Sequence, residues 1–343
     1  MKKVNFFIDD IPVEGSQDES IWTIAKRYGT TLPHLCYSDK PGYRADGNCR
    51  ACMVSVEGER VLAASCIRTP SEGMKVYTKD ERSSKSREMV IELLVTDQPK
   101  KEICHDPDSH FWQMADKVNV KKSRFDKRKP ETIPEADNSH VAMSVNLDAC
   151  INCNLCVRAC REVQVNDVIG MGNRGHTSQV IFDFNDPMGD STCVSCGECV
   201  QACPTGALME SNLLDEKGKK VVKPDRKVDS LCPYCGVGCQ LTYNIKGEKI
   251  VSVDGRDGPA NNNRLCVKGR FGFDYIHNPE RLTKPLIRKD GIPKDPKERI
   301  DPLNPLSHFR EATWDEALDL AANKLLKIRN SKNGKKALAG FGC

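Results

Sequence analysis

The sequence lacks any uninterrupted run of about 18 apolar residues, so it offers no candidate for a membrane-spanning helix. Its first residues, MKKVNFFIDDIPVEG, turn polar after a very short apolar stretch and lack a small-residue cleavage site, which indicates that the chain is not exported. A net charge of only +4 provides no general field for nucleic acid. We therefore expect a cytoplasmic protein with no membrane span and no nucleic-acid partner.

Cysteine is abundant instead, with 18 residues in a chain of 343. A disulfide framework is one interpretation, but it is typical of exported proteins, and clustered thiols in a reducing compartment hold metal more often than they pair. All but Cys104 and Cys343 fall into four groups of four. These groups are Cys36, Cys49, Cys52 and Cys66; Cys150, Cys153, Cys156 and Cys160; Cys193, Cys196, Cys199 and Cys203; and Cys232, Cys235, Cys239 and Cys266.

The second and third groups repeat one motif, CINCNLCVRAC and CVSCGECVQACP, within a unit of residues 140–212. Bacterial two-cluster ferredoxins have the spacing C-x2-C-x2-C-x3-C-P, and the fourth cysteine of each run binds the other cluster. Structural zinc sites, the competing interpretation, use well-separated cysteine pairs rather than two such triplets. The one departure is Arg161, which stands where the pattern has proline. We predict one [4Fe–4S] cluster on Cys150, Cys153, Cys156 and Cys203, and a second on Cys193, Cys196, Cys199 and Cys160.

Residues 1–80 show the pattern of two hairpins and one helix. KVNFFIDDIPVEG predicts two strands around an Asp-Asp turn, ESIWTIAKRYG predicts a helix, and CMVSVEGERVLAAS predicts a second hairpin. The cysteine spacing, C-x12-C-x2-C-x13-C, has a longer first loop than plant-type ferredoxins, so a zinc ribbon stays an alternative. The stretch PHLCYSDKPGYRADGNCRACMVSVEGERVLAASC resembles the [2Fe–2S] domain that opens the large subunit of respiratory complex I and related formate dehydrogenases and iron-only hydrogenases. The resemblance implies a β-grasp, ferredoxin-like domain with a [2Fe–2S] cluster on Cys36, Cys49, Cys52 and Cys66.

Residues 81–139 are predicted to form a helical segment and a basic linker. The run KVNVKKSRFDKRKPE carries seven Lys or Arg, and a solvated linker or a docking patch for an acidic partner would each account for it. The relatives named above commonly hold a further cluster in this region, on a pattern like H-x3-C-x2-C-x5-C. Here only Cys104, His105 and His110 are available, in another arrangement, so we expect that cluster to be absent and Cys104 to be structural rather than reactive or metal-bound.

The fourth group has the spacing C-x2-C-x3-C-x26-C within residues 226–283. LCPYCGVGCQLTYNIKGEKIVSVDGRDGPANNNRLCVKGRFG looks like the [4Fe–4S] domain that opens the catalytic subunits of molybdenum or tungsten bis-pterin oxidoreductases. The resemblance implies a [4Fe–4S] cluster on Cys232, Cys235, Cys239 and Cys266. It also implies that Lys268 lies between cluster and pterin and couples them; without it, Lys268 would be read as a solvent-exposed lysine.

The likeness continues through GFDYIHNPERLTKPLIR and ATWDEALDLAANKL, so residues 284–343 resemble the start of the α/β pterin domain. A helix is predicted after the capping box of Thr313 and Glu316, with Gly334 suited to its C-terminal cap and ALAGFG to a buried strand. In the relatives, the metal-binding Sec or Cys and its histidine come later than any residue matched here. No catalytic residue is therefore expected within 1–343, and Cys343 is taken as incidental.

The order of these units, a multi-domain α+β chain, is most like the alpha subunit of cytosolic NAD(P)-linked formate dehydrogenases. That resemblance implies formate oxidation to CO2, or the reverse, at Mo or W held by two pterin guanine dinucleotides. It implies as partner a flavin- and iron–sulfur-containing subunit that reduces NAD(P), or a ferredoxin. Two alternatives are a complete, non-catalytic electron-transfer subunit of a separate pterin protein and another bis-pterin enzyme such as a nitrate reductase. The helix and strand expected in 311–343 favour a catalytic subunit over a separate carrier, whose exposed strand edge would be unprotected.

Overall fold

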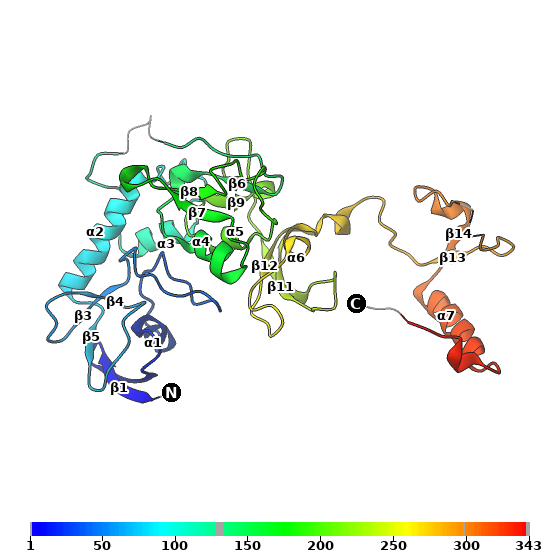
Figure 1. The fold of residues 1–343 in the computed structure, drawn as a ribbon, viewed down its shortest axis with the longest axis horizontal. Coiled ribbons are helices and arrows are strands. Elements are labelled where there is room, and N and C mark those ends of the chain that lie inside the picture. The colour runs from blue at the N-terminus through cyan, green and yellow to red at the C-terminus, as the bar shows by residue number, and fades with distance from the viewer. Residues whose placement is uncertain (1, 128–132, 296, 298, 341–343) are drawn as a thin grey trace. The chain divides into compact units, whose positions relative to one another are not determined.

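The computed structural model describes residues 2–127, 133–295, 297 and 299–340, which belong to two units, residues 1–272 and 273–343. Figure 1 labels most of the helices and strands of the two units, each of which is described by itself below. Among the described residues, no helix combines the length and the apolar character that crossing a membrane requires.

A five-stranded sheet in the order β2-β1-β5-β3-β4 begins the first unit. Its strands are β1 (Lys3–Ile8), β2 (Ile11–Ser16), β3 (Met53–Val56), β4 (Ala63–Ala64) and β5 (Lys75–Tyr77), and helix α1 (Ile21–Arg27) packs on it. The predicted Asp-Asp turn is present, because Asp9 and Asp10 have φ of 49° and 64° and join β1 to β2 in the left-handed conformation that tight hairpins need. The indole of Trp22, 2% exposed, lies in the core between sheet and helix. The two predicted hairpins and the helix are thus all found.

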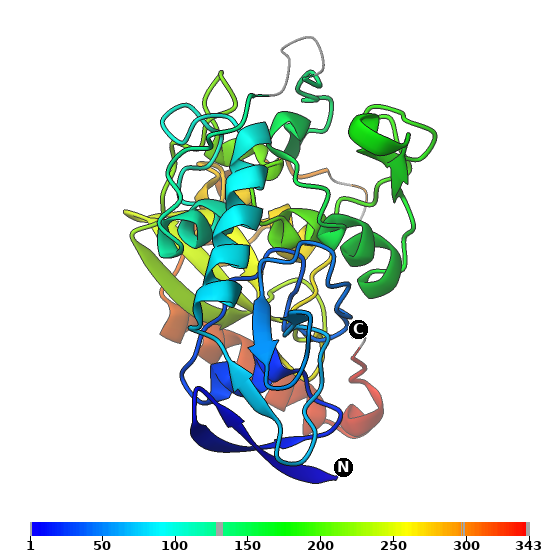
Figure 2. The same cartoon turned by 90° about the vertical axis from the view of Figure 1, so that its left-hand side faces the viewer.

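Two helices link this sheet to the repeated motif. Helix α2 (Glu81–Asp97) is capped by Asp80, whose side chain accepts from the backbone N–H of Ser83. Figure 2 shows α2 rising from the N-terminal sheet. Helix α3 (His110–Lys117) buries Phe111 and Trp112 in one hydrophobic cluster with α2. The sequence pattern predicts a helical segment followed by a linker in this region. It does not predict α3 as a separate helix.

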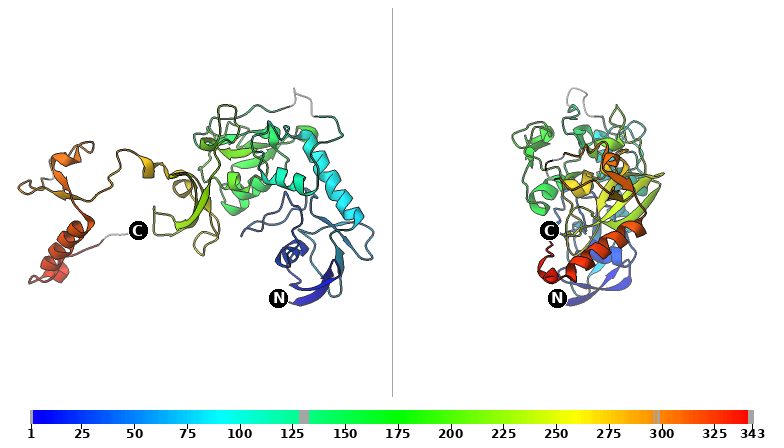
Figure 3. Two further views of the ribbon diagram at one scale, coloured as in Figure 1. Left: turned by 180° about the vertical axis from the view of Figure 1, so that it is seen from behind. Right: turned by 90° about the vertical axis from the view of Figure 1, so that its right-hand side faces the viewer.

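The two cysteine motifs have the same backbone. Each contains a short helix, α4 (Leu155–Arg158) and α5 (Glu198–Ala202), and these helices lie side by side (Figures 1 and 3). The connecting strands are β7 (Ile169–Gly172) and β8 (Gln179–Phe182), which pair with each other, and β6 (Met143–Val145) and β9 (Leu208–Glu210), which pair across the repeat. The residues before the second cysteine (Asn152, φ 52°; Ser195, φ 58°) and after it (Asn154, φ 61°; Gly197, φ 68°) are left-handed in both motifs. The repeat in the sequence is therefore a repeat in structure.

A three-stranded antiparallel sheet completes the first unit. It consists of β10 (Arg226–Leu231), β11 (Gln240–Lys246) and β12 (Lys249–Gly255), of which β11 and β12 form the expected hairpin, and helix α6 (Val267–Phe271) packs against β12. A Cβ on Gly255 would lie 1.9 Å from the carbonyl oxygen of Asn263. This close approach brings the loop before Cys266 back onto the sheet.

The second unit contains β13 (Leu286–Arg288), β14 (Phe309–Glu311) and helix α7 (Trp314–Arg329). The predicted capping box is confirmed, since Thr313 Oγ1 accepts from the N–H of Glu316 at 3.2 Å. Two other predictions are wrong. The helix ends at Asn330 rather than at Gly334, which starts a 3-10 turn, and residues 337–340 form no strand; 341–343, including Cys343, lie outside the described residues.

Candidate cluster-binding sites

The thiols of the first quartet converge beneath the N-terminal sheet. Cys36 lies in the loop after α1, Cys49 and Cys52 precede β3, and Cys66 follows β4. The N–H of Cys49 donates to Cys36 Sγ at 3.4 Å. Hydrogen bonds from the thiols of Cys49 and Cys66 lower the pKa of Cys36, and a hydrogen bond from Cys66 lowers the pKa of Cys52 to about 7. The same hydrogen bonds raise the pKa of Cys49 and of Cys66. The structure thus brings all four predicted ligands together as hydrogen-bonded thiols, and the thiolate is the form that binds iron.

Three thiols of the first motif share a cavity with one thiol of the second motif. One cavity is lined by Cys150, Cys153, Cys156 and Cys203, together with apolar side chains that include Leu147, Val180 and Leu208. Burial raises the pKa of Cys153 and of Cys156, and in both cases the neighbouring charge of Cys203 adds to the effect. Three consecutive thiols and one distant thiol therefore share a water-poor site.

The thiols of the second motif, in turn, lie near one thiol of the first motif, Cys160. Burial raises the pKa of Cys199, and the nearby thiols of Cys196, Cys193 and Cys160 raise it further. Cys160 Sγ accepts the N–H of Val168 at 3.3 Å. In each motif the first sulfur also accepts a backbone N–H at 3.4 Å, from Asn152 to Cys150 and from Ser195 to Cys193.

These donor sets fit iron–sulfur clusters. Within the described residues, no three His, Cys, Asp or Glu side chains form a group that could hold a single metal ion. A cluster differs in presenting several irons, each of which takes its own thiolate, and N–H···S hydrogen bonds help to set its potential. Thiols raised in pKa by burial become stable thiolates once coordinated cations offset their charge. A cavity in which four thiols meet among apolar side chains suits a [4Fe–4S] group.

The fourth quartet is more open than the others. Cys232 N–H donates to the carbonyl oxygen of Cys239 at 2.9 Å, which closes the loop between them. Burial raises the pKa of Cys239, and the thiols of Cys232, Cys235 and Cys266 add to it, so the four sulfurs are neighbours. Cys235 and Cys266 are exposed, as is Lys268 on α6.

The two histidines that follow α2, His105 and His110, form hydrogen bonds to distant parts of the chain. His105 Nδ1 bonds the carbonyl oxygen of Gly218 at 2.9 Å, and Nε2 bonds Asp148 at 2.8 Å. Burial acts to lower the pKa of His105, but these hydrogen bonds outweigh it and the pKa is raised. His110 Nε2 bonds the carbonyl oxygen of His34 at 2.8 Å, and Cys104, 3% exposed, donates to the carbonyl oxygen of Lys101 at 3.2 Å. In the basic run, Arg124 pairs with Glu92 at 3.1 Å, whereas residues 128–131 lie outside the described part.

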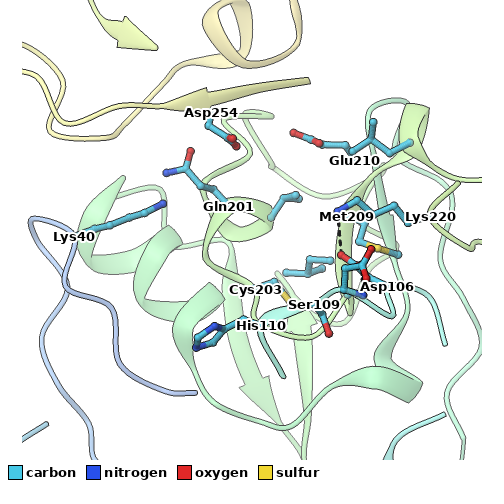
Figure 4. A pocket seen from close by; sticks show the side chains of 15 residues that line it. Lys40, Asp106, Ser109, His110, Gln201, Cys203, Met209, Glu210, Lys220 and Asp254 are labelled. Carbon is cyan, nitrogen blue, oxygen red and sulfur yellow. Dashed lines mark hydrogen bonds and ion pairs between the residues drawn. The ribbon is translucent and has the colours of Figure 1, made fainter. Parts of the chain in front are cut away.

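A polar cavity of about 420 Å³ beside Cys203 is not indicated by any motif (Figure 4). Lys220 pairs with Asp106 at 3.0 Å along one wall. The carboxylates of Glu210 and Asp254 lie at its rim. Burial raises the pKa of Glu210 to about 7, and the charge of Asp254 adds to the effect.

Glu210 should make stability depend on pH. Its folded pKa, about 7, lies above that of an unfolded carboxyl, so the folded state is fully stable below the unfolded pKa and loses stability as pH rises through 7. We expect Glu210→Gln to raise the apparent melting temperature at about pH 8 and to change it little at about pH 5. Thermal scans of the exposed control variant Glu216→Gln should show no such trend. A Glu210→Gln gain that is equal at both pH values would contradict the expectation.

Two buried ion pairs join the modules, and no sequence pattern indicates them. Arg270 and Glu198, each 1% exposed, pair at 3.4 Å, and Tyr43 Oη donates to Glu198 at 2.9 Å. Arg158, 2% exposed, pairs with Asp46 at 3.1 Å. Burial raises the pKa of Glu198, against the opposing charge of Arg270. An arginine on a short helix between ligands carries no sequence signal of its own.

Three known domain families match the chain. A 2Fe-2S iron–sulfur cluster binding domain matches residues 1–81, a 4Fe-4S dicluster domain matches 149–207, and a molybdopterin oxidoreductase Fe4S4 domain matches 225–278. These matches confirm the predicted fold class.

Longer relatives cover nearly the whole chain. A provisionally named formate dehydrogenase of Staphylococcus haemolyticus (strain JCSC1435) is 28% identical over 92% of this chain and 34% of its own length. A subunit of the NADH-quinone oxidoreductase of Rhizobium meliloti (strain 1021) is 31% identical over 93% of this chain and 35% of its own length. The chain thus spans about a third of the length of these relatives.

A solved structure shares the fold. The crystal structure of an NAD+-reducing [NiFe]-hydrogenase in the H2-reduced state contains a chain that aligns with a TM-score of 0.53 at 24% identity, covering 61% of this chain and 87% of that one. Together, the domains and relatives show an iron–sulfur electron-transfer module of oxidoreductase type, with a molybdopterin oxidoreductase Fe4S4 domain.

Proposed function

We propose that this chain is the iron–sulfur relay of a molybdenum or tungsten bis-pterin formate dehydrogenase. Formate is oxidised to CO2 at the pterin-bound metal, or CO2 is reduced, and electrons pass between that metal and NAD(P) through a flavin-containing partner. The observation that carries the proposal is the order of three domains along one chain, with the molybdopterin-type Fe4S4 domain last. The formate dehydrogenase name of one relative and the NAD+-reducing title of the structural neighbour support substrate and partner.

Four ligand sets are proposed. Cys36, Cys49, Cys52 and Cys66 hold a [2Fe–2S] cluster; Cys150, Cys153, Cys156 and Cys203 hold one [4Fe–4S] cluster; Cys193, Cys196, Cys199 and Cys160 hold a second; and Cys232, Cys235, Cys239 and Cys266 hold a third. The shared cavity of the first motif with Cys203 supports the crossed assignment. When bound, these groups supply one-electron transfer.

The residues of the chain provide the surroundings for that chemistry. Buried walls exclude water, and backbone N–H groups donate to the sulfurs of Cys36, Cys150, Cys160 and Cys193. Such hydrogen bonds, with burial, set cluster potentials. Lys268, exposed on α6 two residues after Cys266, is proposed to couple the last cluster to a pterin.

The test is reduction of the native protein by its substrates under anaerobic conditions. Formate, and separately NADH or NADPH, should bleach the visible absorption of the clusters and produce low-temperature EPR signals, while nitrate should not reoxidise them. Reduction by NAD(P)H alone, with no response to formate, would overturn the formate assignment. The intact mass of the native chain, compared with 38.2 kDa, separates a longer catalytic subunit from a non-catalytic relay subunit.

A further inference from the structure

One guanidinium connects the backbones of two ligand sets. Arg158 Nη2 donates to the carbonyl oxygen of Cys36 at 2.6 Å and to the carbonyl oxygen of Cys153 at 3.3 Å. Cys36 belongs to the first quartet, and Cys153 to the first motif of the repeat. The two cysteines also pack in the same buried cluster, and the charge of Cys36 acts on Cys153. The proposed [2Fe–2S] site and the first [4Fe–4S] site therefore meet at Arg158.

The remaining donors of Arg158 fix its orientation. Nε pairs with Asp46 at 3.1 Å, and Nη1 donates to the carbonyl oxygen of Arg44. Asp46 and Arg44 lie in the loop between Cys36 and Cys49, so the first quartet supplies both the counter-ion and a further acceptor. A planar guanidinium presents five N–H donors in a rigid fork, whereas the ammonium of lysine offers three donors on a single nitrogen.

A second buried arginine contacts a ligand backbone at the other end of the dicluster module. Arg270 Nε donates to the carbonyl oxygen of Cys196 at 3.3 Å, and Cys196 holds the place in the second motif that Cys153 holds in the first. The counter-ion of Arg270 is Glu198, which belongs to the dicluster module. Gln201 occupies the place of Arg158 in the second motif, and its side-chain oxygen accepts from Arg270. A buried arginine thus crosses each outer junction.

We propose that Arg158 is a positioning residue for electron exchange between the [2Fe–2S] site and the first [4Fe–4S] site. It holds one ligand backbone of each site against the other, and its positive charge favours the reduced state of both, whereas Asp46 opposes it. One electron crosses the junction, so one site is oxidised and the other reduced by one electron, and no bond breaks. The inference rests on the proposed function only in requiring that both sites bind clusters.

The experiment uses the full chain, purified anaerobically and reduced with dithionite, so its result is independent of formate and NAD(P). Arg158→Met, Arg158→Lys and Asp46→Asn are compared with Arg161→Met, whose exposed arginine on the same segment pairs with Asp167. EPR-monitored redox titration gives the potentials of both sites. Power saturation of the [2Fe–2S] signal reports its magnetic coupling to the neighbouring cluster.

We expect Arg158→Met to shift both potentials to more negative values and to weaken the coupling, with iron content retained. Arg158→Lys keeps the positive charge but loses the planar, forked set of N–H donors. It should weaken the magnetic coupling with a smaller shift of the potentials. Asp46→Asn should shift the potentials in the positive direction, and Arg161→Met should change neither. If Arg158→Met fails to hold clusters, the potential shifts of Arg158→Lys and Asp46→Asn, which should have opposite signs, still test the proposal. Unchanged potentials and coupling in variants that merely melt earlier would make Arg158 a structural tie and overturn the proposal.

Discussion

Replacing Cys150 and Cys203 together by serine is expected to remove one [4Fe–4S] cluster, about four irons per chain, and no more. The two thiols line the same cavity, so the second substitution costs nothing further once the first has emptied the site. Replacing Cys150 and Cys160 together should instead remove two clusters, about eight irons. Iron and sulfide analysis, with EPR of the reduced protein, measures the difference, and the [2Fe–2S] signal should persist in both variants.

The control for these variants is Cys104→Ser, which changes a buried thiol outside the four quartets. It should keep the full iron content. The reverse pattern, two clusters lost with Cys150 and Cys203 but one with Cys150 and Cys160, would show that each motif completes its own cage. Cys199→Ser alone should damage one [4Fe–4S] cluster and leave the [2Fe–2S] signal intact.

Replacing Arg270 by methionine is expected to lower the free energy of unfolding by about 3 to 5 kcal/mol, because it leaves a buried carboxylate without its counter-ion. Glu198 is 1% exposed, and beyond Arg270 its hydrogen-bond donor is Tyr43. Adding Glu198→Gln to Arg270→Met should recover part of the loss, since the amide removes the charge and still accepts from Tyr43. Apparent melting temperatures at one scan rate, followed by cluster absorbance, measure both variants.

An exposed pair supplies the comparison. Arg161 pairs with Asp167, and both side chains are more than half exposed, so Arg161→Met should cost less than about 1 kcal/mol. If the double variant melted no later than Arg270→Met alone, the loss would come from the bonds of Arg270 to Val253 and Cys196 rather than from the unpaired charge.

The local structure around the cysteines could be predicted because spacing and turn chemistry act over a few residues. The hairpin at Asp9 and Asp10 and the cap of α7 at Thr313 follow from such short-range signals, and the structure has both. The assignment of Gly334 to the helix end was wrong because Asn330 ends the helix one turn earlier. A glycine indicates where a helix can stop, not where it must stop.

The contacts between modules could not be predicted in the same way. Arg158 and Arg270 lie on short helices that carry no distinctive pattern, and several of their acceptors are carbonyl oxygens, which every residue possesses. The acceptor Cys36 lies more than one hundred positions before Arg158, and only the folded chain brings them within 2.6 Å. The polar cavity at Glu210 is likewise assembled from distant segments. Side chains that act on backbone atoms leave no pairing pattern to detect.

The crossed lining of the first motif has a consequence for biosynthesis. Cys150, Cys153 and Cys156 leave the ribosome before Cys203, so the growing chain presents an open, three-thiol site to water until the second motif has emerged and folded back. We therefore expect iron delivery to these thiols to follow the folding of both motifs. A translation pause between the motifs would prolong the stage at which these thiols are open to oxidation.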